Sequence, residues 1–576
     1  MCGIAGIFEY SQQKKVTPSE LNQMSEHMRL RGPDGAGFWT NPDESLGFVH
    51  RRLSIIDLST DANQPLHDGV FTIVFNGEIY NYKKCRDDLM QKGYLFKTHS
   101  DTEVILKLYH LHGVGMLNLL RGMFAFSIWD EKNKTLFCAR DPFGIKPFYY
   151  SDNGKCFRFA SQVKTLLSAS STEINTTLSA AGQVGFFLLG SVPEPYTLYE
   201  GIQSLPSGQY LLIDAQGKKI QKEFYNIKSA FIHAENNTHT THTSLQACLY
   251  DTVQHHLIAD VDVGIFLSSG IDSSTLVNVA SDIAPKPTTI TLGFEEYRGT
   301  LKDEVSLAER VADLFKTHQK TKWLSEKIAQ EQREKIFAQM DQPSIDGINT
   351  YFVSWVANQL GMKVALSGLG SDELFAGYPH FSRIAKLTKY VSAFSCVGKI
   401  FRQATKKILS PKEASLLEYS RDCSSAYFLA RALHMPWELE NFLDKDLVKT
   451  GLEELNLFER LKNDCEGIRS KRFQISALDI QWYMRNQLLR DSDWASMSHS
   501  LEIRVPFVDV TFFENVIALC AKKPLSKKEL ANAPHRKLPV DILNRQKTGF
   551  NIPVSQWFSQ SDNMKDFSRV LYKNFI

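Results

Sequence analysis

The spacing of apolar residues changes partway along the chain, and this change restricts the fold more than any other feature. Up to about residue 160, short apolar runs alternate with Gly, Asn and Asp turns, a pattern typical of antiparallel strands. Helical spacing recurs over Pro18–Met28 and over Thr102–Tyr109, where Ser100 and Glu103 resemble a capping box. The predicted strands are Gly3–Phe8, Ser45–Val49, Val70–Phe75, Met123–Trp129, Thr135–Ala139, Pro147–Tyr150 and Phe157–Ala160. An α+β domain is therefore expected first.

After residue 245, strand and helix patterns alternate, which is typical of βαβ units and of a parallel sheet. Beyond residue 380 the pattern is mostly helical. The second half is therefore predicted to be an α/β domain with a largely helical C-terminal part. Its first predicted elements are helix Leu245–Leu257, strand Val263–Leu267, helix Ser273–Ser281, strand Thr288–Phe294, helix Glu304–Phe315 and strand Lys363–Leu366.

A polar segment rich in His and Thr, from His233 to Ser244, marks the most obvious linker. We predict a first domain over residues 2–210, a connector over 211–244 and a second domain over 245–560. The full length of 576 residues is enough for two large domains, each with its own core.

Charge and cysteine usage exclude several classes of function. With 66 basic and 64 acidic residues, a nucleic-acid partner is not expected. The nine cysteines form no Cys-x-x-Cys pair, which argues against structural zinc or a disulfide scaffold and fits a reducing cytoplasm. No run approaches the roughly 18 apolar residues that span a bilayer, so stable membrane insertion is not expected. The basic amphipathic stretch Lys386–Lys412 is interpreted as a solvated helix face rather than a surface for a membrane or partner.

The second residue is a cysteine, so removal of Met1 would leave a thiol and a free α-amine on one residue. An α-amine titrates near pH 8, so part of it is unprotonated at neutral pH and can accept the thiol proton. Cys2 is therefore a candidate nucleophile for amide chemistry. The alternative is that it is a small apolar residue at the start of a strand.

A turn of small residues, Ser268-Ser269-Gly270-Ile271-Asp272, follows a predicted buried strand and precedes a helix. Backbone amides at such a turn can approach an anion closely, and the positive end of the helix points at the same place. The loop lacks the lysine of the usual nucleoside-triphosphatase loop. Asp272 beside a phosphate would be repulsive unless Mg²⁺ lies between them. We therefore predict a phosphate-binding loop with Mg²⁺ beside it. The alternative is an ordinary strand-to-helix loop.

Both ends of the chain resemble known motifs. Met1-Cys2-Gly3-Ile4-Ala5-Gly6-Ile7 resembles the start of class II glutamine amidotransferases, and the 268–274 loop resembles the Ser-Gly-Gly-x-Asp-Ser-Ser loop of ATP pyrophosphatases. Together, in this order, they resemble the glutamine-hydrolysing asparagine synthetase family over nearly the whole chain. Further matches are Arg31-Gly32-Pro33-Asp34-Gly35, Arg52-Leu53-Ser54-Ile55-Ile56-Asp57, Phe75-Asn76-Gly77-Glu78, Ser100-Asp101-Thr102-Glu103, Ala139-Arg140-Asp141-Pro142-Phe143-Gly144, Ser371-Asp372-Glu373-Leu374-Phe375-Ala376-Gly377-Tyr378 and Ser500-Leu501-Glu502-Ile503-Arg504-Val505-Pro506-Phe507.

The resemblance implies an αββα N-terminal nucleophile fold for the glutaminase domain and an ATP pyrophosphatase-type fold for the synthetase domain. It makes Cys2 the nucleophile, with Asn76 and Gly77 as catalytic donors to the oxyanion. Arg52 would hold the glutamine carboxylate and Asp101 its ammonium group. The implied glutamine-binding set is Arg52, Leu53, Ser54, Ile55, Ile56, Asn76, Gly77, Glu78 and Asp101.

For the second domain the resemblance implies ATP as co-substrate, with Mg²⁺ held by Asp272 and Asp372. Lys547 would neutralise the departing pyrophosphate, and ammonia would travel between the domains through an internal passage. The implied ATP-binding set is Leu267, Ser268, Ser269, Gly270, Asp272, Ser273, Ser274, Leu292, Ser367 and Gly368.

One departure from the family pattern concerns the acceptor. Where asparagine synthetases commonly have a glutamate, between Gly368 and Gly370, this chain has Leu369, which cannot carry a proton. The family implies aspartate as acceptor and an ATP-dependent carbon–nitrogen ligase; the alternatives are another carboxylate, such as a sugar uronate in surface-polysaccharide synthesis, or a glutamine-binding scaffold with an inactive synthetase half. Ser269 replaces the second loop glycine, which is tolerable if its φ is negative. The family also suggests a homodimer.

Overall fold

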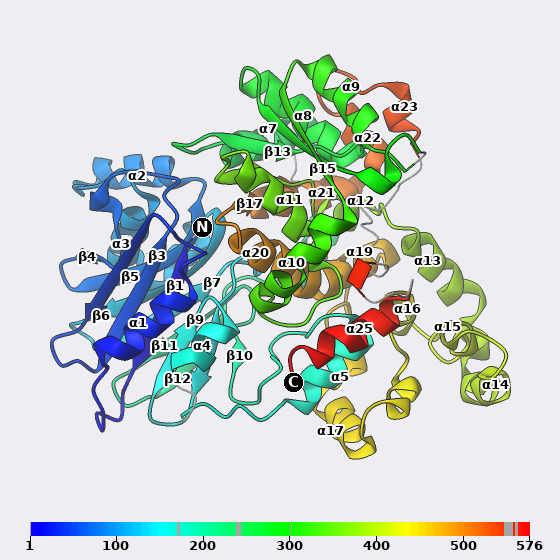
Figure 1. Cartoon of the computed structure of the whole chain (residues 1–576), viewed down its shortest axis with the longest axis horizontal. Coiled ribbons are helices and arrows are strands. Elements are labelled where there is room, and N and C mark those ends of the chain that lie inside the picture. Colours follow the sequence, from blue (N-terminus) through cyan, green and yellow to red (C-terminus); the bar gives the residue numbers. More distant parts are fainter. Residues whose placement is uncertain (1, 170–172, 238–242, 301, 546–556, 559–562) are drawn as a thin grey trace.

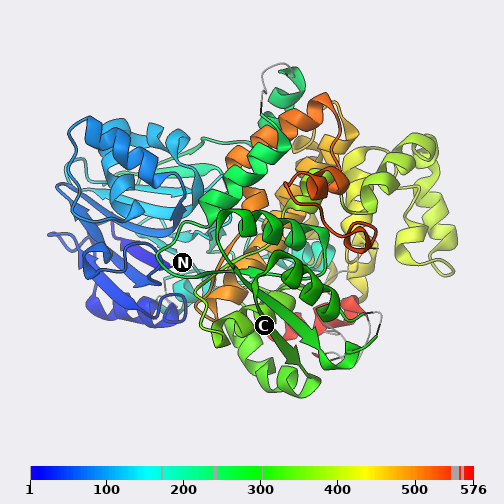
Figure 2. The ribbon, with the colours of Figure 1, turned by 90° about the horizontal axis from the view of Figure 1, so that it is seen from above.

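The computed structural model describes residues 2–169, 173–237, 243–300, 302–545, 557–558 and 563–576. Figure 1 shows two parts, a β-rich N-terminal part in blue and cyan and a helix-rich part that follows it. The same two parts are seen from above in Figure 2.

Two six-stranded sheets pack face to face in the N-terminal part. Apolar side chains from both sheets fill the space between them, among them Phe8, Phe48, Val74 and Trp129. In sheet order, the first sheet contains β10 (Gln203–Ser204), β8 (Tyr149–Asp152), β9 (Phe157–Ala160), β1 (Gly3–Phe8), β3 (Leu46–Arg52) and β2 (Gly35–Thr40). The second contains β12 (Lys219–Glu223), β11 (Gln209–Ile213), β7 (Thr135–Arg140), β6 (Gly122–Asp130), β5 (Phe71–Ile79) and β4 (Leu66–Asp68). The neighbouring strands are antiparallel, as predicted.

Helices cover the outer face of each sheet. Helices α1 (Pro18–His27) and α4 (Val163–Ala169) pack on the first sheet, and α2 (Tyr82–Gln91) and α3 (Asp101–His112) on the second. Ser100 caps α3 by accepting a hydrogen bond from the N–H of Glu103, as the sequence predicts. The predicted αββα sandwich is confirmed.

The N-terminal sheet continues past residue 210, where the sequence analysis places the end of the first domain. Strands β11 and β12 pair with each other, and β11 pairs with β7, so the sheet extends to Glu223. In contrast, α5 (Ala180–Leu189), which lies earlier in the chain, packs on α17 (Lys445–Leu455) within the second part. The chain therefore enters the second core once before it completes the first sheet, a crossing that local patterns do not show.

The second part is built on a five-stranded, wholly parallel sheet. Its strand order is β15 (His318–Leu324), β14 (Thr288–Phe294), β13 (Val263–Phe266), β16 (Val364–Leu366) and β17 (Glu502–Arg504). The connecting helices include α7 (Leu245–His256), α8 (Ile271–Ile283), α9 (Val305–Phe315), α10 (Glu326–Gln339) and α11 (Gly347–Gln359). This confirms the predicted α/β domain.

The rest of the chain is largely helical, as predicted, and includes a π-helical segment, Asp479–Leu489. Among the described residues, no helix is both long and apolar enough to cross a lipid bilayer. The remaining α-helices of the described residues are α6 (Ile227–Asn236), α12 (Ser371–Phe375), α13 (His380–Tyr390), α14 (Gly398–Thr405), α15 (Pro411–Ala414), α16 (Cys423–Arg431), α18 (Leu457–Asn463), α19 (Lys471–Leu478), α20 (Arg490–Met497), α21 (Val510–Lys522), α22 (Lys527–Asn532), α23 (Val540–Leu543) and α25 (Met564–Lys573).

Candidate active sites

Cys2 lies at the start of β1, next to the buried side chain of Asn76 on β5. The backbone N–H of Cys2 donates to Oδ1 of Asn76 at 3.1 Å. The amide Nδ2 of Asn76 is buried and has no hydrogen-bond partner in the protein. A Cβ at the next residue, Gly77, would lie 2.1 Å from the carbonyl oxygen of Met123, so only glycine fits here. A free amide donor is thus held beside the thiol.

A small cavity opens at Cys2 between the ends of β3, β5 and α3. Burial raises the pKa of the Cys2 thiol, while the N–H of Leu53 and the charge of Arg52 lower it. Lining residues that the sequence predicted are Cys2, Arg52, Leu53, Ile55, Ile56, Gly77, Glu78 and Asp101. Lining residues that it did not predict are Ala62, Gln64, Phe75, Ser100 and Thr102.

The two charged ends of this cavity carry opposite signs. Arg52 is buried, and its guanidinium binds the carbonyl of Ser59 and the amide oxygen of Asn63, at 2.6 and 2.9 Å, with no carboxylate among these partners. Asp101 is also buried, and desolvation raises its pKa to about 6 although it accepts the N–H of Ile79. A zwitterionic amino acid laid between the two would compensate both charges.

Ser54 does not line the cavity, although the sequence placed it in the glutamine-binding set. Its N–H instead donates to Oδ2 of Asp34 at 2.8 Å. The same carboxylate oxygen binds Lys363, beside β16, at 2.8 Å. The segment around Ser54 therefore connects the two domains through Asp34.

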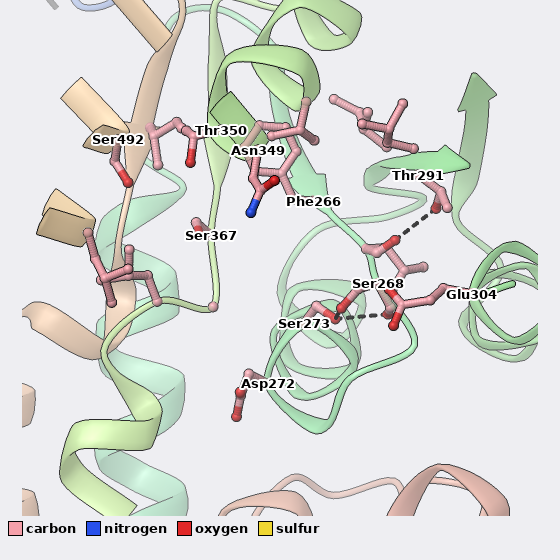
Figure 3. Close-up of a pocket in the computed structure, with 18 residues that line it drawn as sticks. Phe266, Ser268, Asp272, Ser273, Thr291, Glu304, Asn349, Thr350, Ser367 and Ser492 are labelled. Carbon is pink, nitrogen blue, oxygen red and sulfur yellow. Dashed lines mark hydrogen bonds between the residues drawn. The ribbon is translucent and has the colours of Figure 1, made fainter. Parts of the chain in front are cut away.

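In the second domain, a loop joins the end of β13 to the start of α8, as predicted, but the helix begins at Ile271 and not at Ser273. Ser268, Ser269 and Gly270 lie in the loop, and Ser273 and Ser274 lie in the first turn of α8. Figure 3 shows Ser268 and Ser273 side by side, with their hydroxyl oxygens 3.0 Å apart. The hydroxyl of Ser268 also accepts the N–H of Gly270 at 3.2 Å. Ser269 does not have a positive φ, so a serine in place of glycine causes no backbone strain here. Its buried hydroxyl has no partner within the protein.

A largely apolar cavity of about 300 Å³ lies at the C-terminal ends of β13, β14 and β16, the usual place for a ligand in an open parallel sheet. Of the predicted ATP-binding residues, it is lined by Leu267, Ser268, Asp272, Ser273, Leu292, Ser367 and Gly368. Ser269 and Gly270 in the loop, and Ser274 in α8, do not line the cavity. Residues that the sequence did not predict include Phe266, Thr291, Glu304, Asn349, Thr350 and Ser492 (Figure 3).

Asp272 and Asp372, the predicted magnesium ligands, converge on one cation. The ammonium group of Lys527 lies 2.5 Å from Oδ1 of Asp272 and 3.0 Å from Oδ1 of Asp372. Burial opposes the charge on Lys527, yet the two carboxylates leave its pKa raised. A Cβ at Gly377 would lie 1.9 Å from the Asp372 carboxylate, so this glycine makes room for it.

Hard carboxylate oxygens that already share one cation suit Mg²⁺. The described residues contain no group of three or more His, Cys, Asp or Glu able to hold a metal ion, so Mg²⁺ at Asp272 and Asp372 would complete its shell with phosphate oxygens and water. The sequence did not predict Lys527, which no motif marks. Lys547, predicted to contact pyrophosphate, lies outside the described residues.

A second cavity of about 320 Å³ lies beyond the carboxylates. It is lined by Arg431, whose guanidinium lies 3.6 Å from the ring centre of Tyr483 and 4.5 Å from that of Tyr378. Tyr378 donates to Oε1 of Glu373 at 2.9 Å, and Glu373 follows Asp372 directly in α12. Other lining residues are Ser191, Ile345, Asp346, Tyr427, Trp482 and Gln487. A continuous set of polar and aromatic groups thus joins this cavity to the carboxylates.

Strand β17 lies between the Cys2 cavity and the cavity of the parallel sheet. Arg504 on this strand binds Glu78, which lines the Cys2 cavity, at 3.1 Å. Ile503, the residue before it, lines the cavity of the parallel sheet. An apolar cluster of Leu53, Ile55, Val364 and Met497 fills the adjoining interface. The two cavities therefore lie on either side of a contact that combines this apolar cluster with the Arg504–Glu78 ion pair.

The structure combines a thiol site in an αββα sandwich with a nucleotide-sized cavity in a parallel sheet. This combination defines a class of enzyme that releases ammonia from glutamine and attaches it to an acceptor in a reaction driven by ATP. Family comparisons agree with this class: a glutamine amidotransferase domain matches residues 1–225, and asparagine synthase matches residues 244–574. The chain belongs to the asparagine synthase family and is an ATP-dependent glutamine amidotransferase ligase.

Individual relatives span nearly the whole chain. It is 32% identical to asparagine synthetase (glutamine-hydrolysing) 1 of Bacillus subtilis strain 168, over 98% of this chain and 89% of the relative. Asparagine synthetase (glutamine-hydrolysing) 3 of the same strain is 28% identical, over 98% of this chain and 91% of the relative. Amidase chry2 of Gibberella zeae is 26% identical, over 88% of this chain and 81% of the relative. These relatives are therefore named for more than one activity.

Proposed function

We propose that the protein is a glutamine-dependent asparagine synthetase, converting ATP, aspartate, glutamine and water to AMP, pyrophosphate, asparagine and glutamate. The observation that carries the proposal is the pairing of a buried Cys2 cavity with a nucleotide-sized cavity across an interface that contains the apolar residues Leu53, Ile55, Val364 and Met497. Ammonia attacks only in its unprotonated form, so an apolar route between the cavities preserves its reactivity.

In the first domain, the Cys2 sulfur would attack the side-chain amide carbon of glutamine, while its proton passes to the α-amine exposed by removal of Met1. The oxyanion that forms would accept hydrogen bonds from Nδ2 of Asn76 and the N–H of Gly77. The α-amine then returns this proton to the amide nitrogen, and collapse of the intermediate breaks the carbon–nitrogen bond, expels ammonia and leaves a thioester, which water hydrolyses to glutamate. Supporting these roles, Nδ2 of Asn76 is a buried donor without a partner in the protein.

In the second domain, an oxygen of the acceptor carboxylate would attack the α-phosphorus of ATP and displace pyrophosphate. Ammonia would then attack the acyl carbon, and AMP would leave with the electrons of the broken carbon–oxygen bond. Mg²⁺ held by Asp272 and Asp372 would neutralise charge on the phosphates. We assign Lys527, which already contacts both carboxylates, to phosphate binding at the same place.

The acceptor would occupy the cavity beside Arg431. Its aromatic and polar walls suit an amino acid, and the cation Arg431 supplies charge for a carboxylate. Glu373 does not line this cavity but is linked to it through Tyr378, which donates to Glu373 and whose ring contacts Arg431. Burial together with the neighbouring charge of Asp372 raises the pKa of Glu373 to about 7. We propose that Glu373 provides the proton-carrying carboxyl group that is absent at Leu369.

A second candidate function is amidation of another carboxylate, such as a sugar uronate. Two observations favour it: Leu369 lines the nucleotide cavity where the family commonly has glutamate, and the adjoining cavity has stacking surfaces in Tyr427, Trp482 and Tyr483. Aromatic walls with scattered polar groups are a general way to bind sugars and other polar ring systems.

The deciding experiment supplies purified protein with glutamine, ATP and Mg²⁺ and measures pyrophosphate release and product mass. Aspartate-dependent pyrophosphate with asparagine as product is expected. Pyrophosphate release with uronates but not with aspartate would reject asparagine synthesis and support the second candidate function. No acceptor-dependent pyrophosphate with any acid, together with intact glutaminase activity, would support the third possibility, a scaffold with an inactive synthetase half.

A further inference from the structure

Helices α13, α14 and α15 form a lobe, residues 380–414, at the edge of the molecule. Figures 1 and 2 both place it far from the N-terminal domain. From residue 381 to residue 412 it carries eight basic residues and no acidic one, whereas the whole chain is nearly neutral. The basic residues are Arg383, Lys386, Lys389, Lys399, Arg402, Lys406, Lys407 and Lys412. We call this unit the basic lobe.

Large apolar side chains of the basic lobe face solvent. Ile408 is 84% exposed, Ile400 73%, Tyr390 66% and Phe394 59%, with Val397 also exposed. A solvated helix face would show polar groups at these positions. The solvated-face interpretation of this stretch therefore does not account for its most exposed residues.

The lobe is held firmly despite its position. Phe381 and Ile384 are buried against the core. Arg402 binds Glu418 at 2.6 Å. Gly398 packs so closely that a Cβ would lie 2.4 Å from the backbone of Glu418. The exposed apolar groups are thus presented on a fixed surface.

Lysines alternate with the exposed apolar residues along the sequence: Lys389 precedes Tyr390, Lys399 precedes Ile400, and Lys406-Lys407 precede Ile408. An anionic lipid surface accommodates both kinds of group, since headgroups pair with lysine and the acyl boundary takes the apolar side chains. A second copy docked on the same face would bring two lysine-rich surfaces together, which is repulsive. We propose that the basic lobe docks the protein reversibly on an anionic membrane surface.

The test measures co-sedimentation of the full chain with phosphatidylcholine vesicles, with and without phosphatidylglycerol. Binding is expected only with phosphatidylglycerol and should weaken as salt is raised. The variant K399E/K406E/K407E and the variant I400S/I408S should each bind at least ~10-fold more weakly. These residues lie outside both active sites, so ligase activity without vesicles should be unchanged in each, which shows that the variants fold.

A matched control reverses three exposed lysines of the N-terminal domain, K132E/K218E/K222E, and should bind as the unaltered protein does. Equal loss in this control would mean that overall charge, not the lobe, drives binding, and would overturn the proposal. Binding to neutral vesicles as strong as to anionic ones would also overturn it. So would an absence of vesicle binding together with a dimer that I400S/I408S dissociates, which would assign the surface to a second copy.

Discussion

Arg31 and Asp493, from different domains, form a buried two-pronged ion pair, with NH1 and NH2 of Arg31 at 2.7 and 3.0 Å from the carboxylate oxygens. The same arginine donates from Nε to the carbonyl of Cys2 at 3.2 Å. Asp493 lies beside Ser492, which lines the nucleotide cavity. A single side chain therefore connects the thiol residue to the wall of the second cavity.

Removal of either partner should destabilise the protein strongly, because it leaves an uncompensated buried charge. We expect Arg31→Ala and Asp493→Ala each to lower the unfolding free energy by about 3–5 kcal/mol. Denaturant unfolding measures this. The unfolding free energy of the double variant should fall by clearly less than the sum of the two single losses, because the residues are coupled. Additive losses would contradict a direct interaction.

Cys2→Ala should abolish glutamine-dependent synthesis but preserve synthesis from added ammonia. The reason is that Cys2 acts only in the first cavity, whereas ammonia can enter the pathway after it. Amide product from each nitrogen source, measured by mass spectrometry, checks this. Cys396→Ala, at an exposed cysteine, is the control and should keep both activities. Equal loss of both activities in Cys2→Ala would show that the two sites are not separable.

Glutamine use should decline in acid because of Asp101. With its pKa raised to about 6, this carboxyl is ionised above that pH and protonated below it. Only the ionised form attracts the glutamine ammonium group, so below pH 6 kcat/KM for glutamine should fall by a further factor of about ten per pH unit, beyond any loss that protonation of the α-amine causes. Asp101→Asn should raise KM at pH 8 and remove this acid limb. Persistence of the limb in the variant would assign it to another group.

Lys527→Met should impair the synthetase reaction alone. Without the ammonium group, Asp272 and Asp372 lose their shared positive partner, and phosphate charge is less well compensated. We expect acceptor-dependent pyrophosphate release to fall by about 100-fold or more, by comparison with removal of other charge-stabilising donors. Glutaminase activity without ATP should be unchanged. Lys528→Met, at the exposed neighbouring residue, is the control, and a similar loss there would contradict the assignment.

Local pattern predicted the elements that carry most of the site residues. The apolar run before Ser268 and the helical pattern after it predict a strand–loop–helix unit, and the structure has these elements in that order. Ser100 at the start of α3 was recognisable for the same reason, since caps are local signals. Only the resemblance to known motifs allowed the prediction that Arg52 and Asp101 share one cavity, because each residue alone resembles an ordinary surface charge.

Contacts between distant segments could not be predicted. Lys527 and Asp272 are 255 residues apart, and Arg31 and Asp493 are 462 apart, with no periodicity linking them. Strand β17 was missed because Glu502 and Arg504 make it polar in sequence. The structure buries both, since they pair with each other at 2.5 Å and Arg504 also binds Glu78. A strand whose buried charges are paired across a domain interface thus lacks the apolar pattern from which strands are predicted.

Leu369→Glu tests which acceptor the cavity serves. Leu369 lines the nucleotide cavity, and a carboxyl group there would restore the proton carrier common in asparagine synthetases. If aspartate is the acceptor and Glu373 stands in for the missing group, the added glutamate should relieve the dependence on Glu373. Glu373→Gln alone should then lower aspartate-dependent pyrophosphate release by about 100-fold, within the usual range for a general acid or base, and Leu369→Glu/Glu373→Gln should recover part of it. Leu369→Met, which keeps the volume and adds no proton carrier, should recover none. A Glu373→Gln variant with unchanged aspartate activity would remove Glu373 from this role.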